Sequence, residues 1–324
     1  MCICIKGTGS SLPENFMSND DLAKLVDTSD EWIRSRVGIE TRYIVKEETT
    51  TSMAADAAKK ALDNAGISAK DIELIIVASL TGDKIVPSTA CQVQNILGAQ
   101  NAMAFDINSA CSGFVVAFNT AMAYFKSGMY KRALLVGVET LSKIVDWSDR
   151  STCVLFGDGA GAAVVEYNEE GEAYFVQGAD GSRGKALDKD GMPISNPFVH
   201  NEKAGMGLFM DGQAVYKFAV KIIPECVNKL CESSGIEKSE IKYYVLHQAN
   251  KRIIQTAAKR LGEPQEKFPV NVDKYGNTSA ASIPILLDEM NREGKFEDGD
   301  RIVICGFGGG LSWAAALIKW IGEK

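Results

Sequence analysis

Short apolar runs alternate with longer, partly apolar runs along the whole chain. Residues 72–80 and 133–138 are rich in Ile, Val and Leu, which is typical of buried strands. Residues 53–65 and 114–124 are rich in alanine and long enough to form helices. This alternation predicts an α/β protein with buried sheets.

The second half of the chain repeats the order of the first. We interpret the repeat as two similar α/β halves, residues 1–170 and 171–324, packed about a pseudo-twofold axis. Their strand ends are expected to meet at a shared crevice, where such sheets usually bind ligands. Residues 174–212, rich in Gly, Asp, Lys and Pro, are predicted to form an inserted segment that covers this crevice. The matching strand-like runs are 71–77 with 240–246, 104–108 with 268–272, and 132–137 with 301–306.

Composition excludes several classes of protein. The chain has 324 residues and a net charge of -7, which argues against broad binding to nucleic acid or anionic membranes. No apolar run approaches the roughly 20 residues of a membrane span, and no secretory signal is visible. The 8 cysteines show no C-x-x-C spacing and there are only 2 histidines, so we expect reduced thiols in the cytoplasm and no metal site.

Cys111 lies between a predicted strand and a predicted helix. A thiol at a helix N-terminus faces unpaired N–H groups and the positive end of the helix dipole, which predicts a pKa below the usual value of about 8.5. The small neighbours Ala110, Ser112 and Gly113 leave room for a substrate carbonyl. Taken alone, the segment also fits a buried structural cysteine at a tight turn.

Three further segments come from the second half. His247 ends an apolar strand, and Asn277 lies in the turn that corresponds to the Cys111 turn. Each has a structural alternative, because a lone histidine is usually structural and asparagine is a common N-cap. The repeat, however, makes the strand end of His247 face that of Cys111. The glycine-rich residues 306–313 can present backbone N–H groups to a small anion or an oxyanion.

These four segments occur in the order found in thiolase-fold condensing enzymes. The chain most closely resembles the β-ketoacyl-acyl-carrier-protein synthase III family, which initiates type II fatty-acid synthesis. The resemblance spans nearly the whole chain and includes residues 5–14, 27–33 and 156–162. It implies a thiolase-like fold with two similar halves in five αβαβα layers.

The resemblance also implies a reaction, with Cys111, His247 and Asn277 as the catalytic centre. Cys111 takes an acyl primer from acyl-CoA, and His247 and Asn277 hold the thioester carbonyl of malonyl-acyl-carrier protein during decarboxylation. The resulting enolate attacks the Cys111 thioester in a Claisen condensation. The backbone N–H groups of Cys111 and Gly309 form the oxyanion hole. Coenzyme A enters only as the substrate thioester, and no metal or other cofactor is implied.

Several binding residues follow from the same resemblance. Without it, Trp32 also fits an ordinary helix-face anchor, and Arg150 an exposed charge. The implied contacts are Trp32 and Arg150 around the adenine of coenzyme A, Arg36 near its phosphates, Asn250 in ordering the site, and Gly212 and Phe307 along the pantetheine tunnel and the acyl pocket.

Two further expectations concern partners. Lys251, Arg252, Lys259 and Arg260 are predicted to form a basic patch that docks the acidic carrier protein, although a solvated helix face is the alternative for all except Arg252. Val86 stands where acetyl-selective family members carry a phenylalanine that reaches across a homodimer interface to close the acyl pocket. We therefore expect Val86 to leave space for a branched or longer primer.

Three other functions stay open at this point. The first is a condensing enzyme or acyltransferase of secondary metabolism with the same fold. The second is a Cys-His-Asn hydrolase of the papain kind, in which the asparagine orients the histidine. The third is a catalytically silent acyl-binding protein.

Overall fold

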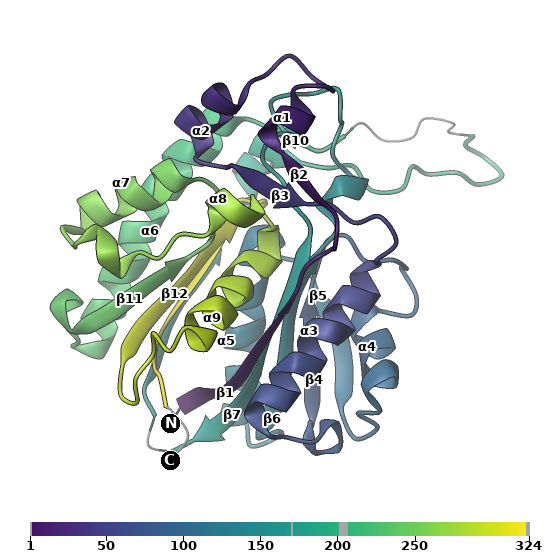
Figure 1. The fold of residues 1–324 in the computed structure, drawn as a ribbon. Coiled ribbons are helices and arrows are strands. Elements are labelled where there is room, and N and C mark those ends of the chain that lie inside the picture. Colours follow the sequence, from purple (N-terminus) through teal and green to yellow (C-terminus); the bar gives the residue numbers. More distant parts are fainter. Residues whose placement is uncertain (1, 170, 201–206, 322–324) are drawn as a thin grey trace.

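Two mixed sheets form the centre of the molecule, which a computed structural model describes for residues 2–169, 171–200 and 207–321 (Figure 1). In both sheets two antiparallel pairings are followed by parallel pairing, so the predicted duplication is present in the topology. The first sheet has the order β1 (Cys2–Ser11), β7 (Gly159–Asn168), β6 (Arg132–Glu139), β4 (Leu74–Ala78) and β5 (Met103–Ile107), and the second has β8 (Ala173–Ala179), β13 (Ser312–Lys319), β12 (Arg301–Gly308) and β11 (Ile241–Leu246).

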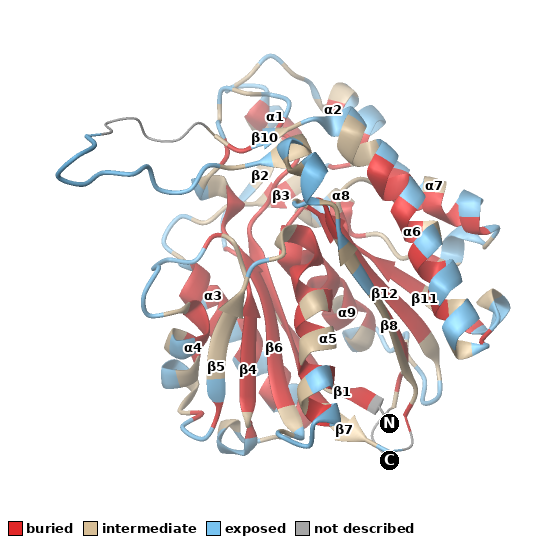
Figure 2. Ribbon diagram, turned by 180° about the vertical axis from the view of Figure 1, so that it is seen from behind, coloured by how far each residue is buried: buried red, intermediate tan, exposed pale blue. Residues whose placement is uncertain are grey.

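Helices complete a five-layer arrangement, as predicted. The strands of both sheets are largely buried between them (Figure 2). No helix among the described residues is long and apolar enough to cross a lipid bilayer. The outer layers are α3 (Thr50–Ala65) and α4 (Thr89–Leu97) on the first sheet and α6 (Gly212–Ser234) and α7 (Lys251–Leu261) on the second, and α5 (Gly113–Lys126) and α9 (Ser282–Arg292) form the central layer.

Small residues let α3 pack closely on the first sheet. The helix begins at a capping box of Thr49 and Ser52, and more than half of the residues that it buries are alanine. A Cβ atom at Gly7 of β1 would lie 2.5 Å from the backbone oxygen of Ala61, so glycine is needed where the strand crosses the helix. The alanine-rich pattern therefore sets the distance between helix and sheet.

One predicted strand was wrong. Residues 268–272 pair with no strand among the described residues, and α8 (Val272–Tyr275) begins at their end. The side-chain amide of Gln248 replaces a neighbouring strand: its Nε2 donates to the oxygen of Pro269 (3.3 Å), and its Oε1 accepts from the N–H of Asn271 (3.0 Å). Pro269 also has no N–H to give to a ladder.

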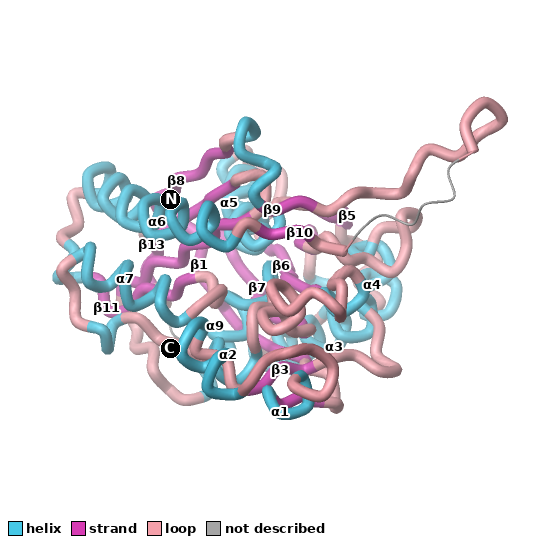
Figure 3. The backbone as a smooth tube through the Cα atoms, turned by 90° about the horizontal axis from the view of Figure 1, so that it is seen from above, coloured by secondary structure: helices cyan, strands magenta, loops and turns pink. Residues whose placement is uncertain are grey.

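The covering segment begins later than predicted. Residues 174–179 belong to β8, an edge strand paired with β13, because the aromatic and β-branched residues Tyr174, Phe175 and Val176 favour a strand. The excursion that follows contains a 3-10 turn (Gly181–Ala186) and the paired strands β9 (Leu187–Asp188) and β10 (Phe209–Met210). After β9 the chain runs outwards from the two sheets (Figure 3). The division between residues 170 and 171 falls between β7 and β8 and stays a prediction.

A small cap lies over the ends of the sheets (Figure 1). Its side chains pack with residues 153–156 of the first half in one apolar cluster. The cap consists of β2 (Phe16–Ser18), α1 (Asn19–Leu22), α2 (Asp30–Val37) and β3 (Thr41–Tyr43).

Candidate active site

Cys111 lies on a 3-10 turn (Ala110–Ser112) between β5 and α5. Ala110 has a φ of 43°, a left-handed conformation that residues with a Cβ rarely adopt. The hydroxyl of Ser112 donates to the oxygen of Ser109 (2.7 Å) and lies 2.9 Å from the hydroxyl of Ser312. These contacts tie the turn to the second half of the protein, and Cys111 is only 6% exposed.

The end of β12 packs closely against Cys111 because residue 308 is a glycine. A Cβ atom at Gly308 would lie 2.8 Å from the Cβ of Cys111 and 3.1 Å from its Sγ, so no other residue fits there without a shift. A Cβ at Gly309 would lie 3.3 Å from the Cβ of Ala110. Gly309, which the resemblance placed in the oxyanion hole, therefore lies beside the turn that carries the thiol.

His247 follows β11 and is buried. Its backbone N–H donates to the oxygen of Cys305 (2.9 Å), and its Nδ1 lies 2.7 Å from the Oγ of Ser282. Ser282 Oγ also accepts from the N–H of Gln248 (3.4 Å), so its own hydrogen can donate to Nδ1 and leave the imidazole proton on Nε2. Burial lowers the pKa of His247 to about 3, which makes the ring neutral at neutral pH.

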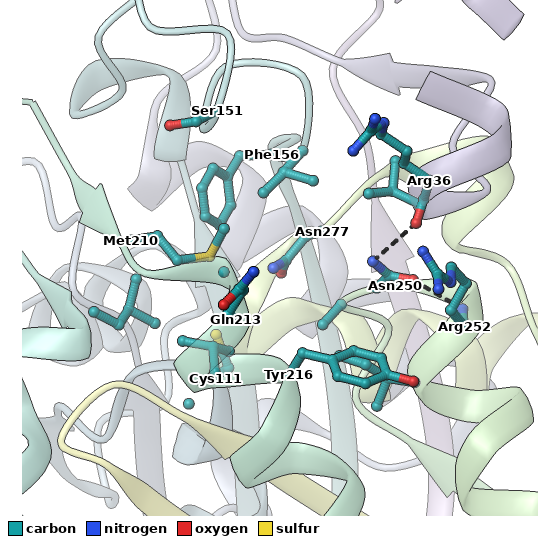
Figure 4. Close-up of a pocket in the computed structure, with 18 of the residues that line it drawn as sticks. Arg36, Cys111, Ser151, Phe156, Met210, Gln213, Tyr216, Asn250, Arg252 and Asn277 are labelled. Carbon is teal, nitrogen blue, oxygen red and sulfur yellow. Dashed lines mark hydrogen bonds between the residues drawn. The ribbon is translucent and has the colours of Figure 1, made fainter. Parts of the chain in front are cut away.

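Asn277 is fixed by its backbone and by its own side chain. Its N–H donates to the oxygen of Leu155 (2.8 Å), and its oxygen accepts from the N–H of Gly157 (3.1 Å). Its Oδ1 accepts from the N–H of Ser279 (2.9 Å), so the NH2 group is the end of the amide that can donate to a ligand. Cys111 and Asn277 both line one pocket (Figure 4).

The three predicted side chains therefore line one cavity, of about 500 Å3. Cys111 also borders a second cavity of about 680 Å3, which Ser279 and Gly309 line as well. Cys111 thus borders both cavities, and the first of them extends to α2 of the cap. The other predicted residues that line the first cavity are Trp32, Arg36, Gly212, Asn250, Arg252 and Phe307.

The predicted low pKa of Cys111 was wrong. Burial raises the pKa of this thiol to about 12; the charge of Glu139 acts in the same direction, and a hydrogen bond from the Ser279 side chain opposes both. The helix α5 begins only at Gly113, after the 3-10 turn, and the loss of thiolate hydration outweighs the helix dipole. The thiol is therefore protonated at neutral pH.

The guanidinium groups of Arg36 and Arg150 both lie over the ring of Trp32 in α2. The Cζ atoms of Arg36 and Arg150 lie 4.7 and 5.4 Å from the centroid of its ring. An adenine between Trp32 and Arg150 would need a separation of about 7 Å, or two contacts of about 3.5 Å. Arg150 therefore has to move for the predicted sandwich to form. Its exposed hydrogen bond to the oxygen of Asp27 (2.7 Å) is the contact that would change.

Asn250 is the N-cap of α7. Its Oδ1 accepts from the N–H of Arg252 (2.8 Å), and its Nδ2 donates to the oxygen of Arg36 (3.5 Å). The residue thus joins α7 to α2 at the cavity (Figure 4). Its expected role in ordering the site stays a prediction.

The four basic residues of α7 do not form one cluster. Lys251 and Arg252 are exposed in its first turn, whereas Lys259 and Arg260 lie in its last turn, about 12 Å away at 1.5 Å per residue. Arg260 also donates to the oxygen of Val220 (2.8 Å). Of the four, only Arg252 lines the first cavity, and Lys251 precedes it in the same turn. Val86 is 82% exposed and lines neither cavity, so it does not reach the site of its own chain.

Sequence reasoning missed four residues around the site: Glu139, Ser279, Ser282 and Gly308. Glu139 could have been found from the sequence, because it is a charged residue at the end of a buried strand. His247 was chosen for the same reason, as a polar residue that follows a buried strand. The two serines lie in a run of small residues that gives no reason to choose between them. Gly308 is one of several neighbouring glycines.

Comparison with known proteins gives a consistent result. The family model described as 3-oxoacyl-[acyl-carrier-protein (ACP)] synthase III matches residues 105–183, and that of its C-terminal part matches residues 231–320. A β-ketoacyl-[acyl-carrier-protein] synthase III of Clostridium acetobutylicum is 49% identical over 318 residues, which cover 98% of each chain.

Solved structures agree in fold over the full length. The 3-oxoacyl-[acyl-carrier-protein] synthase III of Aquifex aeolicus has a TM-score of 0.91 at 46% identity, and the match covers 98% of this chain and 100% of that one. The priming β-ketosynthase of a polyketide biosynthetic pathway also has a TM-score of 0.91, at 34% identity, covering 98% and 96%. The thiolase-like fold is thereby confirmed, and the chain belongs to the β-ketoacyl-acyl-carrier-protein synthase III family.

Proposed function

We propose that this protein catalyses the initiating condensation of fatty-acid synthesis, in which an acyl-CoA primer and malonyl-acyl-carrier protein give a β-ketoacyl-acyl-carrier protein. The observation that carries the proposal is the meeting of Cys111, His247 and Asn277 at one cavity. The same cavity is lined by Trp32 and Arg36, which suit the adenine and phosphates of coenzyme A. The proposed reaction uses no metal and no cofactor beyond the substrate thioester.

In the first step Cys111 attacks the thioester carbonyl of the primer. The carbonyl oxygen becomes an oxyanion, which the N–H groups of Cys111 and Gly309 stabilise. The carbon–sulfur bond to coenzyme A then breaks, and the departing sulfur takes up a proton. Cys111 has exchanged its proton for the acyl group, so the step balances.

In the second step the neutral His247 acts as a hydrogen-bond donor. Its Nε2–H and the NH2 group of Asn277 would hold the thioester oxygen of the malonyl group. Loss of carbon dioxide leaves an enolate on this oxygen, and its carbon attacks the Cys111 thioester. The new carbon–carbon bond forms as the bond to Cys111 breaks, which returns a thiolate that regains a proton.

The proposal extends to partners and location. The exposed Arg252, which lines the cavity, and the exposed Lys251 before it suit an acidic carrier protein. We also propose a cytoplasmic homodimer in which Val86 borders the acyl pocket of the partner. Because Val86 is smaller than phenylalanine, branched or longer primers should be accepted. In a competition assay isobutyryl-CoA or hexanoyl-CoA should outcompete acetyl-CoA; preference for acetyl-CoA would refute this part.

The test of the function is acylation measured by intact mass with a panel of acyl-CoAs. The wild type should gain one acyl group, and Cys111→Ser should neither accumulate the thioester nor condense. Cys91→Ser, which removes an exposed thiol, is the matched control and should be acylated normally. Condensation by Cys111→Ser at the wild-type rate would refute the mechanism.

A second arm separates the two steps. His247→Ala and Asn277→Ala should reduce malonyl decarboxylation by a factor of about 100 or more while sparing acylation of Cys111. Equal loss of both steps would contradict this division of labour. Peptide hydrolysis by the wild type would favour a hydrolase instead, and the panel of primers and carrier proteins tests a role in secondary metabolism.

A further inference from the structure

Arg42 of β3 is among the largest side chains that the described part of the protein buries completely. Burial lowers its pKa to about 10, so the guanidinium is charged at neutral pH. Its Nη2 donates to the oxygen of Val154 (2.8 Å), and its Nη1 donates to the Oδ1 of Asn19 (2.8 Å) and less closely to the oxygen of Met17 (3.4 Å). All three partners are uncharged oxygens. A buried charge with such partners depends on its hydrogen bonds to offset the lost hydration.

The strand β3 connects the two segments that meet at Asn277. On one side, the hydroxyl of Thr41 donates to the oxygen of Lys274 (2.7 Å) in α8, which ends two residues before Asn277 (Figure 1). On the other side, the oxygen of Tyr43 accepts from the N–H of Asp158 (2.8 Å). The strand belongs to neither central sheet, yet it holds a segment of the first half of the chain against a segment of the second.

The segment that Arg42 holds is the one with which the backbone of Asn277 pairs. The N–H of Asn277 donates to the oxygen of Leu155 (2.8 Å), and its oxygen accepts from the N–H of Gly157 (3.1 Å). The oxygen of Val154, which accepts from Arg42, belongs to the peptide group just before Leu155. A shift of this peptide group therefore displaces the acceptor that fixes the Asn277 N–H.

The stem of Arg42 packs against both segments as well. A Cβ atom at Gly157 would lie 3.1 Å from the Cβ of Arg42, and a Cβ atom at Gly276 would lie 3.3 Å from it. Gly276 directly precedes Asn277 and has a φ of 66°, a conformation that favours glycine. The position of Arg42 thus sets how closely the two segments approach each other beside Asn277.

We infer that Arg42 is a positioning residue for Asn277, because it fixes the backbone that aims the Asn277 NH2 group at the thioester oxygen of the malonyl group. This inference rests on the proposed function and adds a residue to its second step. Arg42 itself lines neither cavity. The first step depends on Cys111, whose turn is tied to Ser312 through the hydroxyl of Ser112 (2.9 Å), a bond that does not involve β3. A change at Arg42 should therefore affect the two steps differently.

The test measures both steps in Arg42→Met, which removes the guanidinium and keeps a long apolar stem. Decarboxylation at saturating malonyl-acyl-carrier protein should fall about tenfold or more, while acylation of Cys111 at saturating acyl-CoA stays within about twofold of the wild type. Arg42→Lys keeps the charge and can hold one of the acceptors, so it should show a smaller loss of decarboxylation. This variant also covers the case that Arg42→Met does not fold.

A double variant tests whether Arg42 acts through Asn277. In Asn277→Ala the amide that has to be positioned is gone, so adding Arg42→Met or Arg42→Lys should cause no further loss of decarboxylation. The same fold-change in this background as in the wild type would overturn the inference, because it would mean that Arg42 acts on something other than Asn277.

Arg301→Met is the matched control. The guanidinium of Arg301 donates to Glu172 (3.0 Å) and to Glu240 (2.7 Å) at the start of β12, whereas Gly308 beside Cys111 is at the other end of this strand. The variant thus removes an arginine with its hydrogen bonds far from Asn277, and both steps should proceed as in the wild type.

Two further outcomes separate the inference from the function on which it rests. Equal losses of acylation and decarboxylation in Arg42→Met would overturn the inference, since they indicate a general role in the fold. Absence of acylation in the wild type would refute the proposed function itself. Normal activity of the wild type, with no selective loss of decarboxylation in either Arg42 variant, would refute the role of Arg42 alone.

Discussion

Burial acts in opposite directions on the pKa values of two side chains in the site. It lowers that of His247 to about 3 and raises that of Glu139 to about 7, because each charged form loses its hydration. Both changes favour the neutral form. An uncharged His247 can donate a hydrogen bond to an enolate without first losing a proton, which suits the second step of the proposed reaction.

The pKa of His247 makes stability depend on pH. The unfolded chain binds this proton below a pH of about 6.5, whereas the folded chain binds it only near pH 3. The free energy of unfolding therefore decreases as the pH is lowered through this window, and at pH 5 it is about 2 kcal/mol lower than above pH 7. Glu139 has the opposite effect: because its pKa is raised in the folded protein, its protonation makes the folded state more stable as the pH is lowered. We expect urea unfolding at pH 5 and pH 7 to differ less in His247→Gln than in the wild type; an equal difference would contradict the assignment.

Trp32 provides a test of coenzyme A recognition. Trp32→Ala removes the ring on which Arg36 and Arg150 lie, so the KM for acyl-CoA should rise about tenfold, the loss of 1 to 2 kcal/mol of stacking. Steady-state kinetics with acyl-pantetheine, which lacks the adenine, serve as the control and should show no change. An equal effect on both substrates would mean that Trp32 acts by packing rather than by stacking.

At the scale of elements, α7 depends on its N-cap. The side chain of Asn250 accepts from the N–H of Arg252 (2.8 Å), a bond that Asn250→Ala removes and Asn250→Ser can restore. We expect Asn250→Ala to lower the free energy of unfolding by about 1 kcal/mol and Asn250→Ser to lower it much less. Urea denaturation measures both. Equal loss in the two variants would show that the bond to Arg36, and not the cap, holds the helix.

The elements that could be predicted from sequence are those with a strong apolar period. The strands β4 and β6 and the helices α3 and α5 follow from local composition, and the repeat relates β4 to β11 and β6 to β12. Residues 268–272 could not be predicted correctly, because a side chain, Gln248, takes the place of a strand there.

The candidate site shows the same limit. Its three polar side chains could be predicted from motifs and from the repeat. The pKa of Cys111 could not, because its burial depends on Gly308, which the other half of the chain brings to within contact distance. The position of Ser279 was also hidden, since its backbone conformation and its side-chain hydrogen bond to Glu139 exist only in the folded protein.

At the scale of the whole molecule, the duplicated halves supply different parts of one site. The first half contributes Cys111 at the end of β5, and the second contributes His247, Asn277 and the end of β12. Each half covers its own sheet with two outer helices, and the central helices pack against both sheets. The site therefore exists only when the halves are packed together.

The whole molecule is acidic, with a net charge of -7, so an acidic carrier protein needs a local attraction to dock. Arg252 lies at the cavity and is exposed, whereas Lys259 lies in the last turn of the same helix. Arg252→Glu should raise the KM for malonyl-acyl-carrier protein about tenfold at low salt, with a smaller effect at high salt. Lys259→Glu makes the same change of charge away from the cavity and should have little effect. Equal effects of the two variants would mean that overall charge, rather than a docking contact at the cavity, governs the encounter.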